Sequence, residues 1–126
     1  MAGSRLLVEA SIHDDFVARL VAFTSKARLG DPRDPETEVG SIATAGQMAK
    51  VLEYIEIAKR EGAHCALGGE RAVGAQYGEG WFVQPTIFTG VTNDMRIAQE
   101  EVFGPVLSVI KFQTDDEAVS IANDSR

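Results

Sequence analysis

Two kinds of apolar spacing alternate along this chain of 126 residues. Four short, mostly apolar runs are typical of strands, and they lie at residues 5–9, 63–67, 81–89 and 106–112. Between and after these runs, apolar residues recur every three or four positions, which is the spacing of one helix face. Because strands separated by helices usually form a largely parallel sheet covered by helices, the sequence predicts an α/β fold with the order βααββαβα.

The first helix is expected over residues 12–29. Ser11 with Asp14 fits a capping box, in which the hydroxyl and the carboxylate each satisfy an exposed backbone amide. Gly30 supplies the expected stop. The apolar residues at helical spacing are Ile12, Phe16, Val17, Leu20 and Val21.

A second helix is expected to begin after Thr44, which forms a capping signal with Gln47, and to end at Gly62. Its apolar stripe consists of Met48, Val51, Leu52, Ile55 and Ala58. A short helix is predicted around residues 94–100. Thr114 with Glu117 predicts the cap of a last helix that reaches about residue 123.

Proline and glycine mark the remaining segments. Residues 31–35 (DPRDP) and the glycine-containing residues 70–80 are expected to form loops. Pro85 lacks the amide proton that a strand ladder needs, so the run at 81–89 is expected to be an edge strand or to carry a bulge. Gly68 and Gly69 close the strand at 63–67.

Charge and composition exclude several classes of function. Twelve basic and nineteen acidic residues give a net charge of −7, which argues against a nucleic-acid partner or an anionic membrane surface. The sequence shows no apolar run long enough to span a membrane and does not begin like a secretory signal, so a cytoplasmic location is expected. One cysteine and two histidines predict no disulfide framework and no metal site.

Cys65 is the one thiol that could act as a nucleophile, and His64 stands beside it. Neighbouring strand residues point to opposite faces, so the imidazole is not expected to meet the sulfur, and a structural role is favoured for Cys65. His13, in the first turn of a helix beside two aspartates, is expected to be solvated.

The run QEEVFGPV at residues 99–106 closely resembles a signature of the aldehyde dehydrogenase superfamily. Other segments agree with that family in order and spacing: AGSR at 2–5, GDP at 30–32, YI at 54–55, EGA at 61–63, Phe82, and QPTIF at 84–88. Ser41 departs from the proline that the family often has after Val39-Gly40, which leaves that loop's shape open. The resemblance covers essentially the whole chain and implies that residues 1–126 are one partial catalytic domain, without the cofactor-binding and oligomerisation parts.

This resemblance also implies a function. The family oxidises an aldehyde to a carboxylic acid with NAD or NADP through a cysteine thiolate, which would lie immediately before Met1, so no catalytic residue is expected within the chain. Glu101 is expected to bind both hydroxyls of the nicotinamide ribose, and Phe103 to pack on the same ribose and the nicotinamide. Gly104 is expected to permit an unusual backbone angle. The parent is expected to be a homo-oligomer, and the isolated chain to be inactive and to bind the cofactor weakly.

The sequence also leaves open structural alternatives to the cofactor-binding roles of Glu101 and Phe103. Glu101 could be a solvated acid at a helix end, and Phe103 an ordinary core residue. Both ends of the chain suggest a fragment of a longer protein, because the first strand begins at once and the last helix lacks a glycine stop. A different class of function is a stand-alone, non-catalytic α/β module that associates through its exposed sheet edges.

Overall fold

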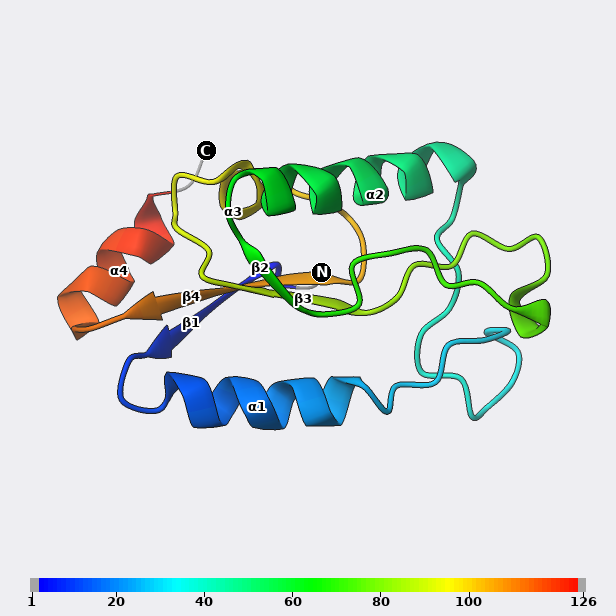
Figure 1. Cartoon of the computed structure of the whole chain (residues 1–126), viewed down its shortest axis with the longest axis horizontal. Coiled ribbons are helices and arrows are strands. Elements are labelled where there is room, and N and C mark those ends of the chain that lie inside the picture. Colours follow the sequence, from blue (N-terminus) through cyan, green and yellow to red (C-terminus); the bar gives the residue numbers. More distant parts are fainter. Residues whose placement is uncertain (1–2, 125–126) are drawn as a thin grey trace.

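The computed structural model describes residues 3–124. Along this part of the chain the elements follow the predicted order βααββαβα, with one extra 3-10 turn (Figure 1). The elements are β1 (Arg5–Glu9), α1 (His13–Thr24), α2 (Ala45–Arg60), β2 (His64–Leu67), η1 (Ala75–Tyr77), β3 (Thr86–Thr89), α3 (Arg96–Gln99), β4 (Val106–Phe112) and α4 (Asp115–Asn123).

The four strands form one mixed, mostly parallel sheet in the order β1-β4-β3-β2. β4 pairs in parallel with β1 on one side and with β3 on the other, whereas β2 pairs antiparallel with β3. The predicted largely parallel α/β sheet is therefore confirmed. β3 and β4 occupy the centre and are the most buried strands, as expected for strands covered on both faces.

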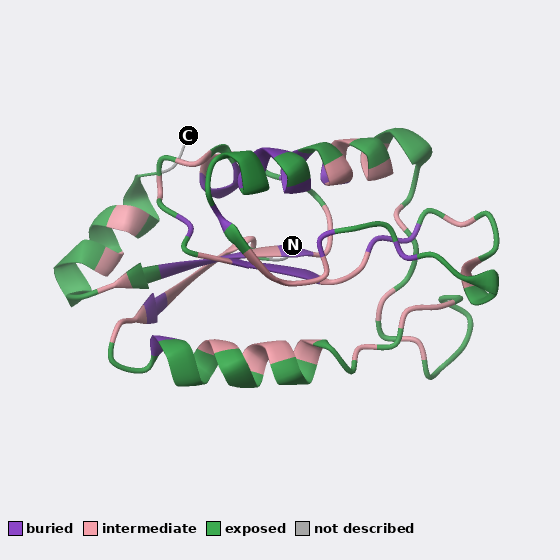
Figure 2. Ribbon diagram, viewed as in Figure 1, coloured by how far each residue is buried: buried purple, intermediate pink, exposed green. Residues whose placement is uncertain are grey.

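Helices cover both faces of the sheet (Figure 1). The α2 and α3 side forms the larger core, in which Val51, Ile55, Phe88, Ile97 and Ile110 are buried. On the opposite face Val17, Leu20 and Val21 of α1 pack against a smaller cluster of Val8, Ile87 and Val109. Figure 2 shows the buried residues concentrated on the central strands and on the sheet side of α2. Among residues 3–124, no helix is both long and apolar enough to cross a membrane.

The start of α1 differs from the prediction. The Ser11 hydroxyl donates to a carboxylate oxygen of Glu9 at 2.5 Å, so it does not cap the helix. Asp14 instead lies 2.6 Å from Nδ1 of His13, whose side chain is buried at 8% exposure, and the expectation of a solvated histidine is wrong. A buried polar ring requires a partner, and Asp14 supplies one.

The extent and the apolar face of α1 also differ from expectation. The helix ends at Thr24, five residues before the predicted position, and Gly30 does not terminate it. Ile12 and Phe16 belong to the predicted apolar stripe, yet both are exposed. The predicted apolar stripe is broader than the sheet surface on which α1 packs. Only Val17, Leu20 and Val21 are therefore covered by the sheet.

The predicted caps of α2 and α4 are confirmed. The Thr44 hydroxyl accepts a hydrogen bond from the Gln47 amide at 3.1 Å, and the Thr114 hydroxyl accepts one from the Glu117 amide at 3.2 Å. Gly62 follows α2 with a φ of +100°, a left-handed conformation that glycine adopts without cost.

The expectation of an edge strand around Pro85 is wrong, because β3 lies between β4 and β2. Pro85 immediately precedes β3 and therefore takes no place in its ladder. The irregularity that proline suggested lies in the neighbouring strand β2, where the register shifts between Cys65 and Leu67.

Candidate functional site

The segment that connects α3 to β4, residues 100–105, lines a cavity of about 330 Å³. The residues that line it are Gly3, Ser4, Glu101, Val102, Phe103, Gly104 and Val106. Ser4 and Val106 adjoin the amino ends of the parallel neighbours β1 and β4, where the Ser108 amide donates to the Ser4 carbonyl oxygen at 2.9 Å. Residues about one hundred positions apart thus meet at one end of the sheet.

Glu101 and Phe103 are both exposed at this cavity. The Phe103 side chain is 70% exposed, so the alternative of an ordinary core phenylalanine is wrong. The Glu101 carboxylate has no hydrogen-bond or ion-pair partner among residues 3–124. Two carboxylate oxygens are therefore available to accept hydrogen bonds from a ligand.

Phe103 has a φ of +54°, and within residues 3–124 no other residue except glycine has a positive φ. A bulky residue in the left-handed region is strained, at a cost of about 1–3 kcal/mol, and persists only where its surroundings hold it. The side-chain amide of Gln47 donates to the carbonyl oxygens of Val102 at 2.8 Å and Phe103 at 3.0 Å. Gln47 therefore fixes the two peptide groups that flank the strained residue.

Lys50 and Tyr54 also tie this segment to α2. The Lys50 ammonium donates to the carbonyl oxygen of Glu101 at 3.0 Å and lies 5.8 Å from the centre of the Phe103 ring. One turn further along α2, the Tyr54 hydroxyl donates to a carboxylate oxygen of Glu100. Arg96 contacts both oxygens of that carboxylate, with Nε 2.9 Å from Oε1 and Nη2 3.1 Å from Oε2, the oxygen that also accepts from Tyr54.

These contacts raise the pKa values of Tyr54 and Arg96. The hydrogen bond to Glu100 raises the pKa of the Tyr54 phenol, since the neutral hydroxyl is the form that donates to a carboxylate. Burial and the negative charge of Glu100 act in the same direction, whereas Arg96 lowers the pKa of Tyr54. The pKa of Arg96 is raised, mainly by its hydrogen bonds to Glu100.

The sequence predicts an unusual backbone angle at Gly104, but its φ is not positive. The left-handed residue of this segment is Phe103. Glycine is required at this position by close packing instead. A β-carbon on Gly104 would lie 2.6 Å from Cγ2 of Val51, which is fully buried in α2.

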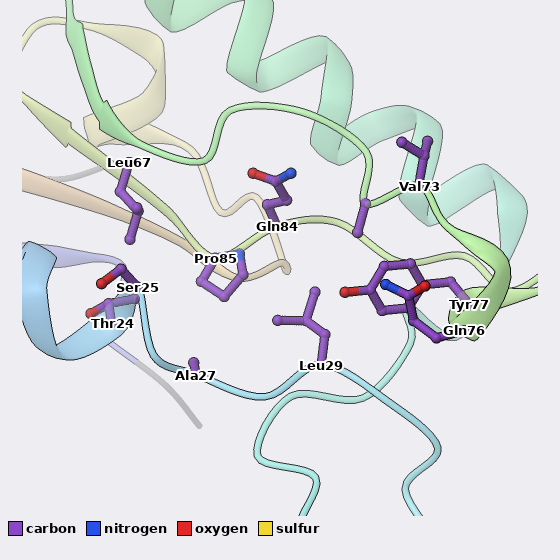
Figure 3. Close-up of a pocket in the computed structure, with 11 residues that line it drawn as sticks. Thr24, Ser25, Ala27, Leu29, Leu67, Val73, Gln76, Tyr77, Gln84 and Pro85 are labelled. Atoms are coloured by element: carbon purple, nitrogen blue, oxygen red, sulfur yellow. The ribbon is translucent and has the colours of Figure 1, made fainter.

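A second cavity, of about 240 Å³, lies between the end of α1 and the loop that precedes β3 (Figure 3). Figure 3 shows Thr24 and Ser25 on one side and Gln84, Pro85 and Tyr77 around the rest. Its lining contains hydroxyl groups, on Thr24, Ser25 and Tyr77, but no carboxylate, histidine, lysine or thiol that could activate them.

The other reactive side chains stand apart from the cavity that Glu101 lines. Cys65 is half-buried, packs against the larger core and lies 3.3 Å from the Leu67 carbonyl oxygen, while His64 is exposed. This arrangement agrees with a structural role for Cys65. Within residues 3–124, no three His, Cys, Asp or Glu side chains are grouped closely enough to hold a metal ion.

Sequence reasoning missed the residues of α2 that hold the segment. Gln47 was interpreted only as part of a helix cap, and Tyr54 only as part of a family match. A usable signal was present, because Gln47, Lys50 and Tyr54 are spaced three and four residues apart and therefore share one helix face. The sequence predicts Arg5 only as part of a strand and of the AGSR run, yet its side chain donates to Asn93 at 2.9 Å and to the Ile121 carbonyl oxygen at 3.1 Å.

The fold and its sequence recur together in known oxidoreductases. The chain belongs to the aldehyde dehydrogenase family, whose model matches residues 1–126. It is 50% identical over 123 residues to a betaine aldehyde dehydrogenase of Mesorhizobium japonicum, covering 98% of this chain and 25% of that protein. It is 51% identical over 123 residues to a probable aldehyde dehydrogenase of Mycobacterium tuberculosis, covering 97% of this chain and 24% of the relative.

A solved structure gives the same result. The crystal structure of a betaine aldehyde dehydrogenase from Staphylococcus aureus in complex with NAD+ superposes with a TM-score of 0.96 at 44% identity, covering 98% of this chain and 25% of the other. The chain thus spans about a quarter of the length of the relatives that it matches. The resemblance inferred from residues 99–106 is confirmed at the level of the family.

Proposed function

We propose that this chain is the part of an NAD- or NADP-dependent aldehyde dehydrogenase that binds the nicotinamide ribose, with Glu101 and Phe103 as the contacts. The parent protein would oxidise an aldehyde to a carboxylic acid. The observation that carries the proposal is the shared cavity, which Glu101 and Phe103 line together with Gly3 and Ser4. By the family resemblance, Gly3 and Ser4 follow closely after the nucleophilic cysteine, so the cofactor contacts would lie beside the reacting centre.

The groups at the cavity fit a ribose. A vicinal diol presents two hydroxyl donors, and the Glu101 carboxylate presents two acceptors that have no partner among residues 3–124. The exposed ring of Phe103 offers a flat apolar surface for the sugar or the nicotinamide. When bound, the nicotinamide would accept hydride from the substrate.

The role of this chain's own residues is binding and orientation. A carboxylate that grips both ribose hydroxyls limits the rotation of the group that they carry, and such positioning contributes to rate. No residue of this chain is proposed as the nucleophile. We therefore expect no oxidation of aldehydes by the isolated chain with NAD+ or NADP+, and turnover above that of a heat-inactivated sample would contradict this expectation.

A titration with nicotinamide mononucleotide tests the binding role, because this compound contains the ribose and the nicotinamide without the adenosine half. In amide NMR spectra of the chain, we expect the signals of Glu101, Phe103 and Gly3 to move progressively. Glu101→Ala should abolish the movement, while the matched control Glu53→Ala, an exposed acid on α2, should retain it. Movement confined to other residues, or equal binding by the Glu101→Ala variant, would refute the proposal.

One observation favours the second candidate, a non-catalytic module that associates through its sheet edges. Within residues 3–124, β1 pairs on one side only, so the other side of this five-residue strand is an edge. Sedimentation of the isolated chain at increasing concentration tests this candidate. A monomer at all concentrations would exclude it, and an oligomer dispersed by Leu7→Pro, which removes an edge donor, would support it.

A further inference from the structure

Glu100 and Glu101 are adjacent in the sequence, but their carboxylates have opposite environments. The Glu100 carboxylate is half-buried and is held by the Tyr54 hydroxyl and the Arg96 guanidinium. The Glu101 carboxylate is exposed and has no such partner among residues 3–124. One acid is therefore fixed within the protein while its neighbour is available to a ligand.

The contacts along α2 explain how the segment is aligned. Residues 100–103 run antiparallel to α2, since Tyr54 contacts Glu100, Lys50 contacts Glu101, and Gln47 contacts the next two residues. Seven helical steps from Gln47 to Tyr54 rise about 10 Å. The backbone at Glu100 is extended, and three fully extended steps from residue 100 to residue 103 would span about the same 10 Å. The helix and the segment thus match in length, and contacts at both ends fix the register between them.

The Glu100 carboxylate lies at the Tyr54 end of the contact between α2 and residues 100–103. Tyr54 is almost fully buried, so its hydroxyl has a fixed position. The Arg96 guanidinium lies 5.4 Å from the centre of the Tyr54 ring, and the Arg96 backbone amide donates to a Glu61 carboxylate oxygen at 2.9 Å. A carboxylate that receives a bidentate guanidinium and a phenol is held in both distance and orientation.

We propose that Glu100 is a positioning residue for the ligand-binding segment: through Tyr54 and Arg96 it sets the register of residues 100–103 on α2, which directs the Glu101 carboxylate into the cavity and keeps Phe103 left-handed. The ligand part of this inference rests on the proposed function of Glu101. The conformational part does not, because it concerns the backbone of the chain itself.

Two conservative variants test the inference. Tyr54→Phe removes the hydroxyl and keeps the ring in the core, and Glu100→Gln removes the charge and keeps the size. Glu56→Gln is the matched control, because it removes an exposed ion pair with Lys59 on the same helix without touching residues 100–104. The first readout is the backbone carbon chemical shifts of Phe103, which report its φ. The second is the affinity for nicotinamide mononucleotide.

In both test variants we expect the Phe103 shifts to move from left-handed towards extended values and the affinity to fall about tenfold, which corresponds to 1.4 kcal/mol. Glu56→Gln should change neither. A purely structural ion pair would lower the unfolding midpoint and leave the Phe103 shifts unchanged, and unchanged shifts in a folded Tyr54→Phe variant would overturn the inference. If the unsubstituted chain does not bind the mononucleotide, the proposed function of Glu101 fails, and the Phe103 shifts alone decide the role of Glu100.

Discussion

Gly104 packs directly against Val51, and the contact leaves no room for a side chain. A β-carbon on Gly104 would lie 2.6 Å from Cγ2 and 2.9 Å from Cγ1 of Val51, closer than folded proteins tolerate. Val51 is fully buried and cannot yield without disturbing the larger core. This contact brings the end of the segment 100–105 against α2.

Substituting Gly104 should therefore destabilise the chain through overpacking. We expect Gly104→Ala to lower the free energy of unfolding by about 1–3 kcal/mol, measured by chemical denaturation. In the double variant, Val51→Ala should relieve part of this cost. It removes both γ-carbons of residue 51 and leaves its β-carbon, which lies further from the new β-carbon at position 104. The control is Gly46→Ala in α2, where nothing lies within 4 Å of the new β-carbon and the stability should not fall. Strict additivity of Gly104→Ala and Val51→Ala would contradict the packing argument.

Gln47 should control the conformation of Phe103. Gln47→Glu keeps the shape and the backbone amide that Thr44 caps, but it replaces the donor with a carboxylate that repels the Val102 and Phe103 carbonyl oxygens. We expect a loss of about 1–3 kcal/mol in stability and a shift of Phe103 away from the left-handed region. Backbone carbon chemical shifts of Phe103 measure the effect. An unchanged Phe103 signal in the folded variant would show that Gln47 does not hold the segment.

Tyr54 should ionise above the ordinary tyrosine pKa of about 10, because Glu100 favours its neutral form. Since this pKa is raised in the folded chain, the stabilisation is complete below the unfolded pKa and is lost as the pH rises through the folded pKa. Glu100→Gln should lower the pKa of Tyr54, and Arg96→Met should raise it further. Ring-carbon NMR of Tyr54 as a function of pH measures both shifts, and changes in the same direction would contradict the described contacts.

Substitutions at Gly68 and Gly62 distinguish the stability cost of backbone strain from that of steric overlap. Both have a positive φ, of +68° and +100°, but a β-carbon on Gly68 would lie 2.3 Å from the Pro85 carbonyl oxygen, whereas one on Gly62 would meet nothing within 4 Å. We expect Gly62→Ala to cost about 1–2 kcal/mol from strain alone. Gly68→Ala should cost a further 1–3 kcal/mol or so from the overlap. Thermal denaturation of the two variants compares them, and equal losses would rule out the overlap as a cause.

Local signals in the sequence predicted most of the secondary structure. The caps at Thr44 and Thr114, the stop at Gly62 and the apolar stripe of α2 were all confirmed, because each depends on residues only a few positions apart. The same reasoning failed at Ser11, whose hydroxyl is within reach of Glu9 as well as of the helix amides. Which of two nearby partners a hydroxyl chooses is decided by the packing of the chain around it.

The sequence singled out residues 99–106 by their family resemblance, but it could not predict their conformation. Residues 99–106 carried the family resemblance and directed attention to Glu101 and Phe103. The exposure of Phe103, its left-handed backbone and the close packing of Gly104 appear only when α2 lies against them. Tyr54 and Glu100 are 46 positions apart, and Gln47 and Val102 are 55 apart, so no local pattern connects them.

By itself, the sequence determined the order of helices and strands, the α/β class, and which short run carries the resemblance to the aldehyde dehydrogenase family. Apolar periodicity and capping act over a few residues and can be interpreted along the chain. The tertiary structure alone decided that His13 is buried and that β3 is central. It also decided that the Glu100 carboxylate is held, while the Glu101 carboxylate has no partner among residues 3–124. These outcomes depend on which distant surfaces meet, because burial and the choice of polar partners are fixed only when the helices pack on the sheet.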